Sequence, residues 1–169
     1  MERVAIVGVP GAGMSTLARA VGERCGLPVV HLDAHYFEPG WQPKPADEWQ
    51  RIYGKLVSGD RWVMDGAFAM GRALDRADVV VVLDLPRRQG LVGAIKRNLH
   101  RRREPPPDFA PGCRERFDRQ FFRLLRFIWR YDKLDRRELE KRLAGLRADQ
   151  QVVRLRSRAE AAAYLRTLG

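Results

Sequence analysis

Three glycines and two hydroxyl residues lie close together near the start of the chain, in the sequence GVPGAGMST. Gly8, Gly11 and Gly13 allow backbone angles that other residues avoid, so amide N–H groups between them can turn toward the oxygens of a phosphate group. The positive end of a following helix adds to this attraction. The spacing therefore predicts a phosphate-binding loop made of Gly8, Pro10, Gly11, Ala12, Gly13, Met14, Ser15 and Thr16.

The two hydroxyl residues at the end of this loop suggest its ligands. At these offsets we expect Ser15 to bind Mg²⁺ and Thr16 to meet an α-phosphate, which predicts ATP or another nucleoside triphosphate and Mg²⁺ as cofactors. The alternative is a tight turn followed by a capped helix. An apolar strand pattern, the four-residue glycine spacing and the Ser-Thr pair occur together here and favour the phosphate-binding interpretation.

Met14 occupies the position where such a loop usually carries a lysine. That lysine bridges the β- and γ-phosphates as charge shifts during transfer, and removing one such donor typically costs about 3 kcal/mol, or about a hundredfold in rate. Either another cation replaces it, or transfer is slow or absent. The candidate replacements are two arginines one helical turn apart and an arginine stripe further on: Arg97 and Arg101, then Arg119, Arg123, Arg126 and Arg130. A solvated basic face explains the stripe equally well.

Two aspartates end predicted strands and are candidates for acid–base and metal chemistry. Asp33 is expected at the carboxyl edge of the sheet, where open α/β folds bind ligands, and could accept a proton from a substrate hydroxyl. Its alternative role is to cap a turn before His35. Asp65, directly before Gly66, resembles the acidic residue of a Walker B or Asp-Gly turn, and we expect it to support the metal and the substrate.

Further residues are candidates for the substrate side of the site. His35 could line a substrate cleft together with nearby aromatic residues, although core packing is the favoured role of each aromatic. Arg72 and Arg76 follow Asp65 at helical spacing and could bind a substrate phosphate, while a solvated helix face explains them equally well.

Short β-favouring runs alternate with helical segments along the chain, which predicts a parallel α/β sheet. The predicted strands are Val4–Gly8, Pro28–Asp33, Arg61–Asp65, Asp78–Leu85 and Gln151–Leu155. The continuous apolar run of residues 79–83 is typical of a strand covered on both faces, so we place it in mid-sheet. Repeated prolines predict a loop over residues 101–113, which is either a lid or a connector, and a helix follows over residues 114–132.

The 169 residues, 45% of them hydrophobic, suit one domain covering residues 1–169. No apolar run approaches the roughly 20 residues that span a bilayer, so we expect a cytoplasmic protein without a membrane partner. The net charge of +11 favours polyanionic partners, either nucleotides or nonspecifically bound nucleic acid. The two cysteines, Cys25 and Cys113, lack metal-ligand spacing.

The loop together with VVHLDAHYFEPGWQP, WVMDGAF, PPDFAPGC, FIWRY and VVRLRSRAEAAAYL resembles a bacterial family of small adenylate-kinase-like P-loop proteins, the topology modulation proteins. The resemblance covers nearly the full chain. It implies a nucleotide-kinase-like three-layer α/β sandwich, with a five-stranded parallel sheet flanked by helices and a lid-like helical excursion at about residues 97–118. The chain departs from the family pattern at Met14, and at Ala67 and Phe68, where members carry Asn and Tyr.

Three functions remain open on the sequence. The first is an ATP-dependent phosphotransferase of the small-molecule or nucleotide kinase type, with a degenerate Walker A loop and an unknown phosphate acceptor. The second is a pseudokinase that binds nucleotide without transferring phosphate. This hypothesis is suggested by Met14, which stands in place of the usual lysine. The third is a basic nucleic-acid-associated protein, although no helix-turn-helix, zinc-finger or RNA-recognition signature is present. A monomer or a homodimer is expected.

Overall fold

The computed structural model describes residues 1–66, 71–100, 110, 112–113 and 117–169. The elements in chain order are β1 (Arg3–Gly8), α1 (Met14–Cys25), β2 (Val29–His31), α2 (Leu32–Tyr36), β3 (Phe37–Glu38), β4 (Gln42–Pro43), α3 (Ala46–Val57), β5 (Trp62–Asp65), α4 (Arg72–Arg76), β6 (Val79–Leu83), α5 (Arg87–His100), α6 (Arg119–Ala144), β7 (Gln151–Leu155) and α7 (Arg158–Arg166).

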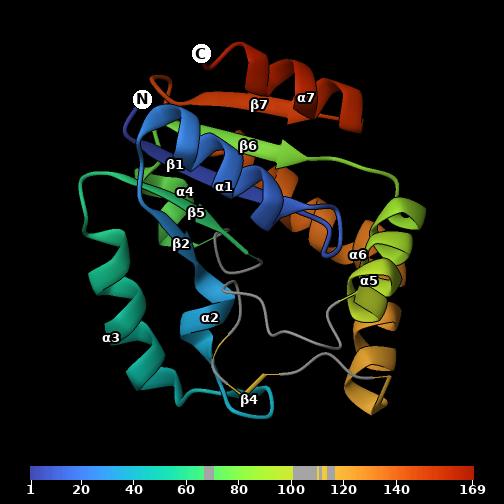
Figure 1. Cartoon of the computed structure of the whole chain (residues 1–169). Helices are drawn as coiled ribbons and strands as arrows, with labels where there is room; N and C mark the ends of the chain where they lie inside the picture. The colour runs from blue at the N-terminus through green and yellow to red at the C-terminus, as the bar shows by residue number, and fades with distance from the viewer. Residues whose placement is uncertain (67–70, 101–109, 111, 114–116) are drawn as a thin grey trace.

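A five-stranded sheet with the order β2-β5-β1-β6-β7 forms the centre of the molecule (Figure 1). All four of its strand pairs are parallel, and Ile6 of β1 lies in register with Asp65 on one side and Val81 on the other. The predicted parallel α/β sheet is therefore confirmed, as is the interior position of residues 79–83. Each of the five β6 residues is buried, as a strand covered on both faces requires.

Two apolar clusters fill the spaces on either side of the sheet. One joins β1 and β6 to α1 through Leu17 and Val21, and the other joins the opposite face to α3 and α4 through Trp49 and Leu74. The long helix α6 contributes to both clusters, with Ile128 in the first and Leu139 in the second. Since α6 has 26 residues, it is about 39 Å long and reaches from one face to the other.

Helix α6 begins later than the sequence indicates, at residue 119 rather than 114, and continues to residue 144. The Asp118 side chain fixes this start by accepting hydrogen bonds from the backbone N–H groups of Gln120 and Phe121, at 2.9 and 3.0 Å. Of the predicted loop and lid, residues 97–100 belong to α5, and Ala110 accepts a turn hydrogen bond from the Cys113 N–H. Most of the remainder, including Arg101, lies outside the described residues.

A small two-stranded sheet, β3 with β4, follows α2 and was not anticipated. Its turn places Gly40 and Trp41 at φ values of 77° and 63°, and the Trp41 N–H donates to the Glu38 carbonyl. Within the described part of the chain, no helix combines the length and apolar character needed to cross a membrane.

Candidate active site

The glycine-rich segment connects the carboxyl end of β1 to the first turn of α1, as predicted (Figure 1). Gly11 and Gly13 have φ values of 82° and 101°, a conformation that only glycine adopts without strain. Helix α1 begins at Met14, and no side-chain hydrogen bond caps it. The first N–H groups of a helix have no partner within it, so this end of α1 can donate hydrogen bonds to an anionic ligand.

Helix α5 packs directly on the back of this loop. A Cβ atom at Gly11 would collide with the Gly90 carbonyl oxygen and lie 3.0 Å from the Ala94 nitrogen, and a Cβ atom at Gly93 would collide with the Gly11 carbonyl oxygen. The two segments therefore meet backbone against backbone. Arg97 lies one turn beyond Gly93, so this contact sets the distance between the loop and the Arg97 side chain.

Met14 is half-buried and packs against the apolar cluster beneath α1. A lysine at this position would direct an ammonium group toward the phosphates, whereas the thioether of Met14 adds to the core. The loop therefore has two glycines at positive φ and no cationic side chain at position 14.

An ionisable cluster lies at the carboxyl edge of β2 and β5. His31 ends β2 in register with Asp65 at the end of β5, and the His31 Nδ1 and Asp65 Oδ1 atoms are 2.5 Å apart. Both side chains are largely enclosed, with exposed fractions of 12% and 4%. Sequence reasoning singled out Asp65 but missed His31, because only the strand pairing shows that the two residues are neighbours.

Asp33 belongs to the same cluster. Its Oδ1 atom would lie only 3.2 Å from a Cβ atom at Gly66, which has φ 123° and follows Asp65 directly. Burial and, to a smaller extent, the charge of Asp65 raise the pKa of the Asp33 carboxyl, while Arg97 and His31 lower it, and the net result is a rise from 3.8 to about 6. A carboxyl group with this pKa can accept a proton near neutral pH. The structure therefore places Asp33 beside Asp65 and Gly66, within range of the Arg97 charge.

His35, in α2, is half-buried beside this cluster. Burial lowers its pKa below 6.5, and the charge of His31 lowers it further, so His35 is neutral at pH 7. The aromatic residues that follow pack against one another edge to face, Tyr36 on Trp49 at 5.1 Å and Phe37 on Trp41 at 5.3 Å. These contacts are consistent with the core-packing role that was predicted for these aromatic residues.

The arginines of α4 are not brought to the loop. The Arg72 guanidinium donates to Gln50 Oε1 and lies over the Tyr53 ring at 5.9 Å, so this side chain is held by α3. Arg76 ends α4 three residues before β6 and so lies near the amino edge of the sheet, opposite the carboxyl edge where Asp33 and Asp65 meet. Substrate-phosphate roles for these two residues remain predictions.

The predicted arginine stripe lies along α6, and its four side chains are all exposed: Arg119, Arg123, Arg126 and Arg130. The face of α6 that packs on the molecule is instead apolar, with Phe121 and Ile128 buried. The arginine stripe is therefore a solvated basic face in this structure. Catalytic roles for Arg123 and Arg126 remain predictions, as does that of Arg101.

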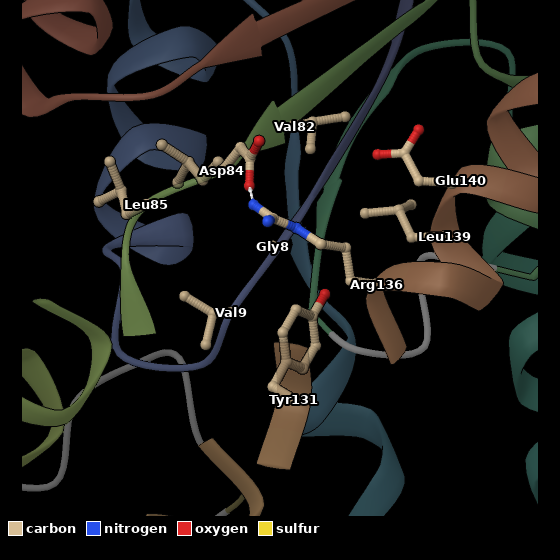
Figure 2. Close-up of a pocket in the computed structure, with 10 residues that line it drawn as sticks. Gly8, Val9, Val82, Asp84, Leu85, Tyr131, Arg136, Leu139 and Glu140 are labelled. Carbon is tan, nitrogen blue, oxygen red and sulfur yellow. Dashed lines mark hydrogen bonds and ion pairs between the residues drawn. The ribbon is translucent and has the colours of Figure 1, made fainter. Parts of the chain in front are cut away.

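A small pocket lies beside the start of the loop, between the ends of β1 and β6 and helix α6 (Figure 2). Arg136 of α6 crosses it to pair with the Asp84 carboxylate, as Figure 2 shows. On the same helix, Glu140 accepts two hydrogen bonds from Arg154, both of 2.6 Å. These ion pairs tie α6 to the edge of the sheet and give Asp84 a structural partner.

Mg²⁺ usually binds through one or two carboxylates, waters and substrate phosphates rather than an all-protein cage. Among the described residues, no group of three His, Cys, Asp or Glu side chains forms such a cage. The residues present fit the usual arrangement, with a hydroxyl at Ser15 that is partly exposed and a carboxylate at Asp65.

Solved structures of small-molecule and nucleoside kinases share this fold. Shikimate kinase from Acinetobacter baumannii, in complex with shikimate, has a TM-score of 0.61 at 15% identity, covering 99% of this chain and 90% of that chain. A kinase described as putative from Chloroflexus aurantiacus has a TM-score of 0.54 at 14% identity, covering 99% and 96%. Deoxyadenosine kinase from M. mycoides, with bound dATP, has a TM-score of 0.51 at 11% identity, covering 99% of both chains.

At these identities the similarity shows the fold alone, and the chain has a P-loop kinase fold. No protein-family model and no curated protein sequence matches the chain.

Proposed function

We propose that this chain is an ATP-dependent phosphotransferase of the small-molecule or nucleotide kinase type that acts in the cytoplasm. The observation that carries the proposal is the convergence of Asp33, Asp65 and Arg97 beside a glycine-rich loop with its backbone geometry intact. Loop, base, metal-binding carboxylate and cation are the parts that phosphoryl transfer requires. Assignment to the topology modulation type belongs to the same proposal.

Each residue of the site has a proposed role. Backbone N–H groups of residues 11–16 hold the phosphates, and bound ATP with Mg²⁺ supplies the phosphoryl group. Ser15 and Asp65 hold the metal, and His31 fixes the orientation of the Asp65 carboxylate through their 2.5 Å contact. Asp33 accepts the proton of the acceptor hydroxyl, for which its pKa of about 6 is suited.

Arg97 is the proposed replacement for the missing lysine. Its charge already acts on Asp33, and α5 carries it one turn past the backbone contact between Gly93 and Gly11. A guanidinium is charged at every physiological pH and can bind phosphate oxygens in a bidentate manner. Arg97 can therefore supply the charge that Met14 does not.

The first test is calorimetric titration of the protein with ATP, ADP and a nonhydrolysable ATP analogue, each with and without Mg²⁺. Magnesium-dependent binding that favours the triphosphate is the expected result. A screen of hydroxylated acceptors follows, starting with shikimate and deoxynucleosides because the neighbours carrying the fold act on or bind such molecules. Absence of ATP turnover with every acceptor would contradict the proposal.

A pseudokinase is the second candidate, and the packing of Met14 into the apolar cluster favours it. The substitution Met14→Lys separates the two functions. If it creates activity that the native chain lacks, the present function is binding. If the native chain already turns over ATP, the first proposal holds and the substitution only changes the rate.

A nucleic-acid-associated role rests on the net charge of +11 and the exposed arginines of α6. Duplex binding that disappears at moderate salt, without sequence preference, would reduce this third candidate to nonspecific attraction.

A further inference from the structure

Large apolar side chains are exposed mainly at one place on the molecule. Of the nine such side chains that are exposed in the described residues, six lie on α5 and α6. Five of the six form what is here called the outer apolar face: Val92, Ile95 and Leu99 of α5, with exposed fractions of 49%, 38% and 54%, and Phe122 and Trp129 of α6, at 62% and 51%. Exposed apolar patches of this kind mark interaction sites.

Helical geometry places these residues on one side of each helix. Val92, Ile95 and Leu99 are three and four residues apart, and Phe122 and Trp129 are seven apart, so each group lies along a single face. On α5 this face is turned away from Gly90 and Gly93, which contact the loop. The outer apolar face therefore lies on the side of α5 that points away from the phosphate loop.

The two helices that carry these groups pack side by side (Figure 1). A Cβ atom at Gly90 of α5 would lie 3.3 Å from the Ile128 side chain of α6. One residue further on, Trp129 turns outward, and the Arg87 guanidinium of α5 lies 4.2 Å from its ring centroid. Arg87 thus connects the start of α5 to the α6 group.

Positive charge predominates around this face, although the exposed Asp118 caps α6 one turn before Phe122. Residues 87–100 and 119–131 contain no Asp or Glu, and these segments carry exposed cationic side chains: Arg88, Lys96, Arg119, Arg123, Arg126 and Arg130. An apolar strip of aliphatic and aromatic residues flanked by Lys and Arg is the pattern of helices that lie in the interface of an anionic bilayer.

We propose that the outer apolar face binds the surface of membranes that contain anionic lipid. Two copies of this face would bring arginines against arginines, which argues against a dimer through it. Nucleic-acid bases stack on open aromatic rings, but Arg87 covers one face of Trp129, and aliphatic side chains form most of the α5 group. A peptide helix would need a groove, but this surface is formed by two adjacent helices, which disfavours such a partner. A fluid bilayer, by contrast, requires no matching shape.

This contact is peripheral, so it is compatible with the finding that no described helix spans a membrane. It reverses the sequence-based expectation of no membrane partner, which rested only on the lack of a long apolar run.

The test is cosedimentation of the full chain with vesicles of phosphatidylcholine alone and of phosphatidylcholine with 30% phosphatidylglycerol. We expect binding to the anionic vesicles only. The double variant Leu99→Ser, Phe122→Ser should weaken this binding at least tenfold, because each side chain of this size loses a burial contribution equal to about a tenfold change. Val152→Ser, on β7 with 39% exposure, is the matched control and should bind as the native chain does.

Two further measurements complete the test. Arg123→Glu with Arg126→Glu should also reduce binding, and emission of Trp129, the most exposed tryptophan that the structure describes, should shift to the blue with anionic vesicles. Circular dichroism and nucleotide titration confirm that each variant folds. Three results would overturn the proposal: no vesicle binding by the native chain, binding unaffected by the double variant, or a dimer or single-stranded DNA complex that depends on the same residues in place of vesicle binding.

Discussion

The phosphate loop and the β2–β5 cluster lie at the same edge of the sheet but are built from different groups. The loop relies on backbone, with two glycines at positive φ, an uncapped helix start and a backbone contact with α5. The cluster relies on ionisable side chains, with His31, Asp33 and Asp65 held close together. Met14 alters a side chain and leaves the backbone geometry in place, so in the proposed function binding and transfer of phosphate would depend on separable parts of the site.

The largest effect is expected where α5 meets the loop. Gly93→Val should lower the free energy of unfolding by about 3 kcal/mol or more and abolish nucleotide binding, because the new side chain would collide with the Gly11 carbonyl oxygen. Denaturant unfolding and calorimetry measure both quantities. Gly59→Ala is the control, since its Cβ atom would lie 3.5 Å from the nearest atom, in ordinary contact. Equal stability of the Gly93 variant and the native chain would show that the backbone contact does not hold the loop.

Asp33→Asn should separate activity from stability. Loss of the general base should lower turnover about 10²–10⁴-fold. The folded-state pKa of Asp33 is raised from 3.8 to about 6, so the protonated carboxyl favours the folded chain, and this contribution is present below about pH 4 and lost as the pH rises through 6. At pH 7 Asp33 of the native chain is ionised and this stabilisation is absent. The amide in Asp33→Asn stays uncharged, so the free energy of unfolding of the variant should exceed that of the native chain by at most about 3 kcal/mol. Lower stability of the variant at pH 7 would contradict the burial argument.

The same raised pKa predicts a pH profile for the native chain under the proposed function. Turnover should increase as the pH rises through about 6, because only the ionised Asp33 accepts a proton. The ascending limb should disappear in Asp33→Asn. An ascending limb that persists in this variant would assign it to another group.

Arg97→Ala should lower turnover about a hundredfold with a much smaller effect on stability, because it removes the cation proposed to replace the loop lysine. Arg97→Lys should recover part of the rate. The matched control is Arg123→Ala, an exposed arginine on the outward face of α6, which should leave turnover unchanged. If the control lowers turnover as much as Arg97→Ala, the α6 stripe reaches the site after all.

The smallest effect concerns the positioning of Asp65. His31→Ala should weaken the apparent affinity for Mg²⁺ about tenfold, while nucleotide binding without metal stays the same, because the loop backbone is untouched. His31→Asn keeps a hydrogen-bond donor and should restore part of the affinity. Titration of activity against Mg²⁺ concentration measures the difference, and identical metal dependence in all three proteins would exclude the positioning role.

Local patterns were sufficient to predict the loop and the five strands of the large sheet. The end of the second strand was wrong, because β2 ends at His31 and Asp33 lies in the first turn of α2. Val79–Leu83 is a continuous apolar run because both of its faces are buried, and Gly11 and Gly13 of the loop stand where the backbone has a positive φ. Such features depend on a few neighbouring residues, so a single sequence carries them.

Contacts between distant segments could not be predicted in this way. The pairing of His31 with Asp65 depends on the register of β2 and β5, and the contact of Gly93 with Gly11 depends on where α5 docks. Two glycines three residues apart in a helix, Gly90 and Gly93, were the available signal for a close approach of backbones. The α6 arginines show the opposite case, since their spacing was clear but gave no information on which side faces the site.

The absence of any side chain between Gly11 and Gly93 also affects how the molecule can respond to a ligand. Where side chains separate two segments, a change of rotamer can absorb a displacement of one of them. Here carbonyl oxygen meets backbone, and interiors packed at this density transmit displacements. The loop cannot shift toward α5 unless α5 moves with it, so occupancy of the proposed nucleotide site would be mechanically coupled to the helix that carries Val92, Ile95 and Leu99 on its outer side.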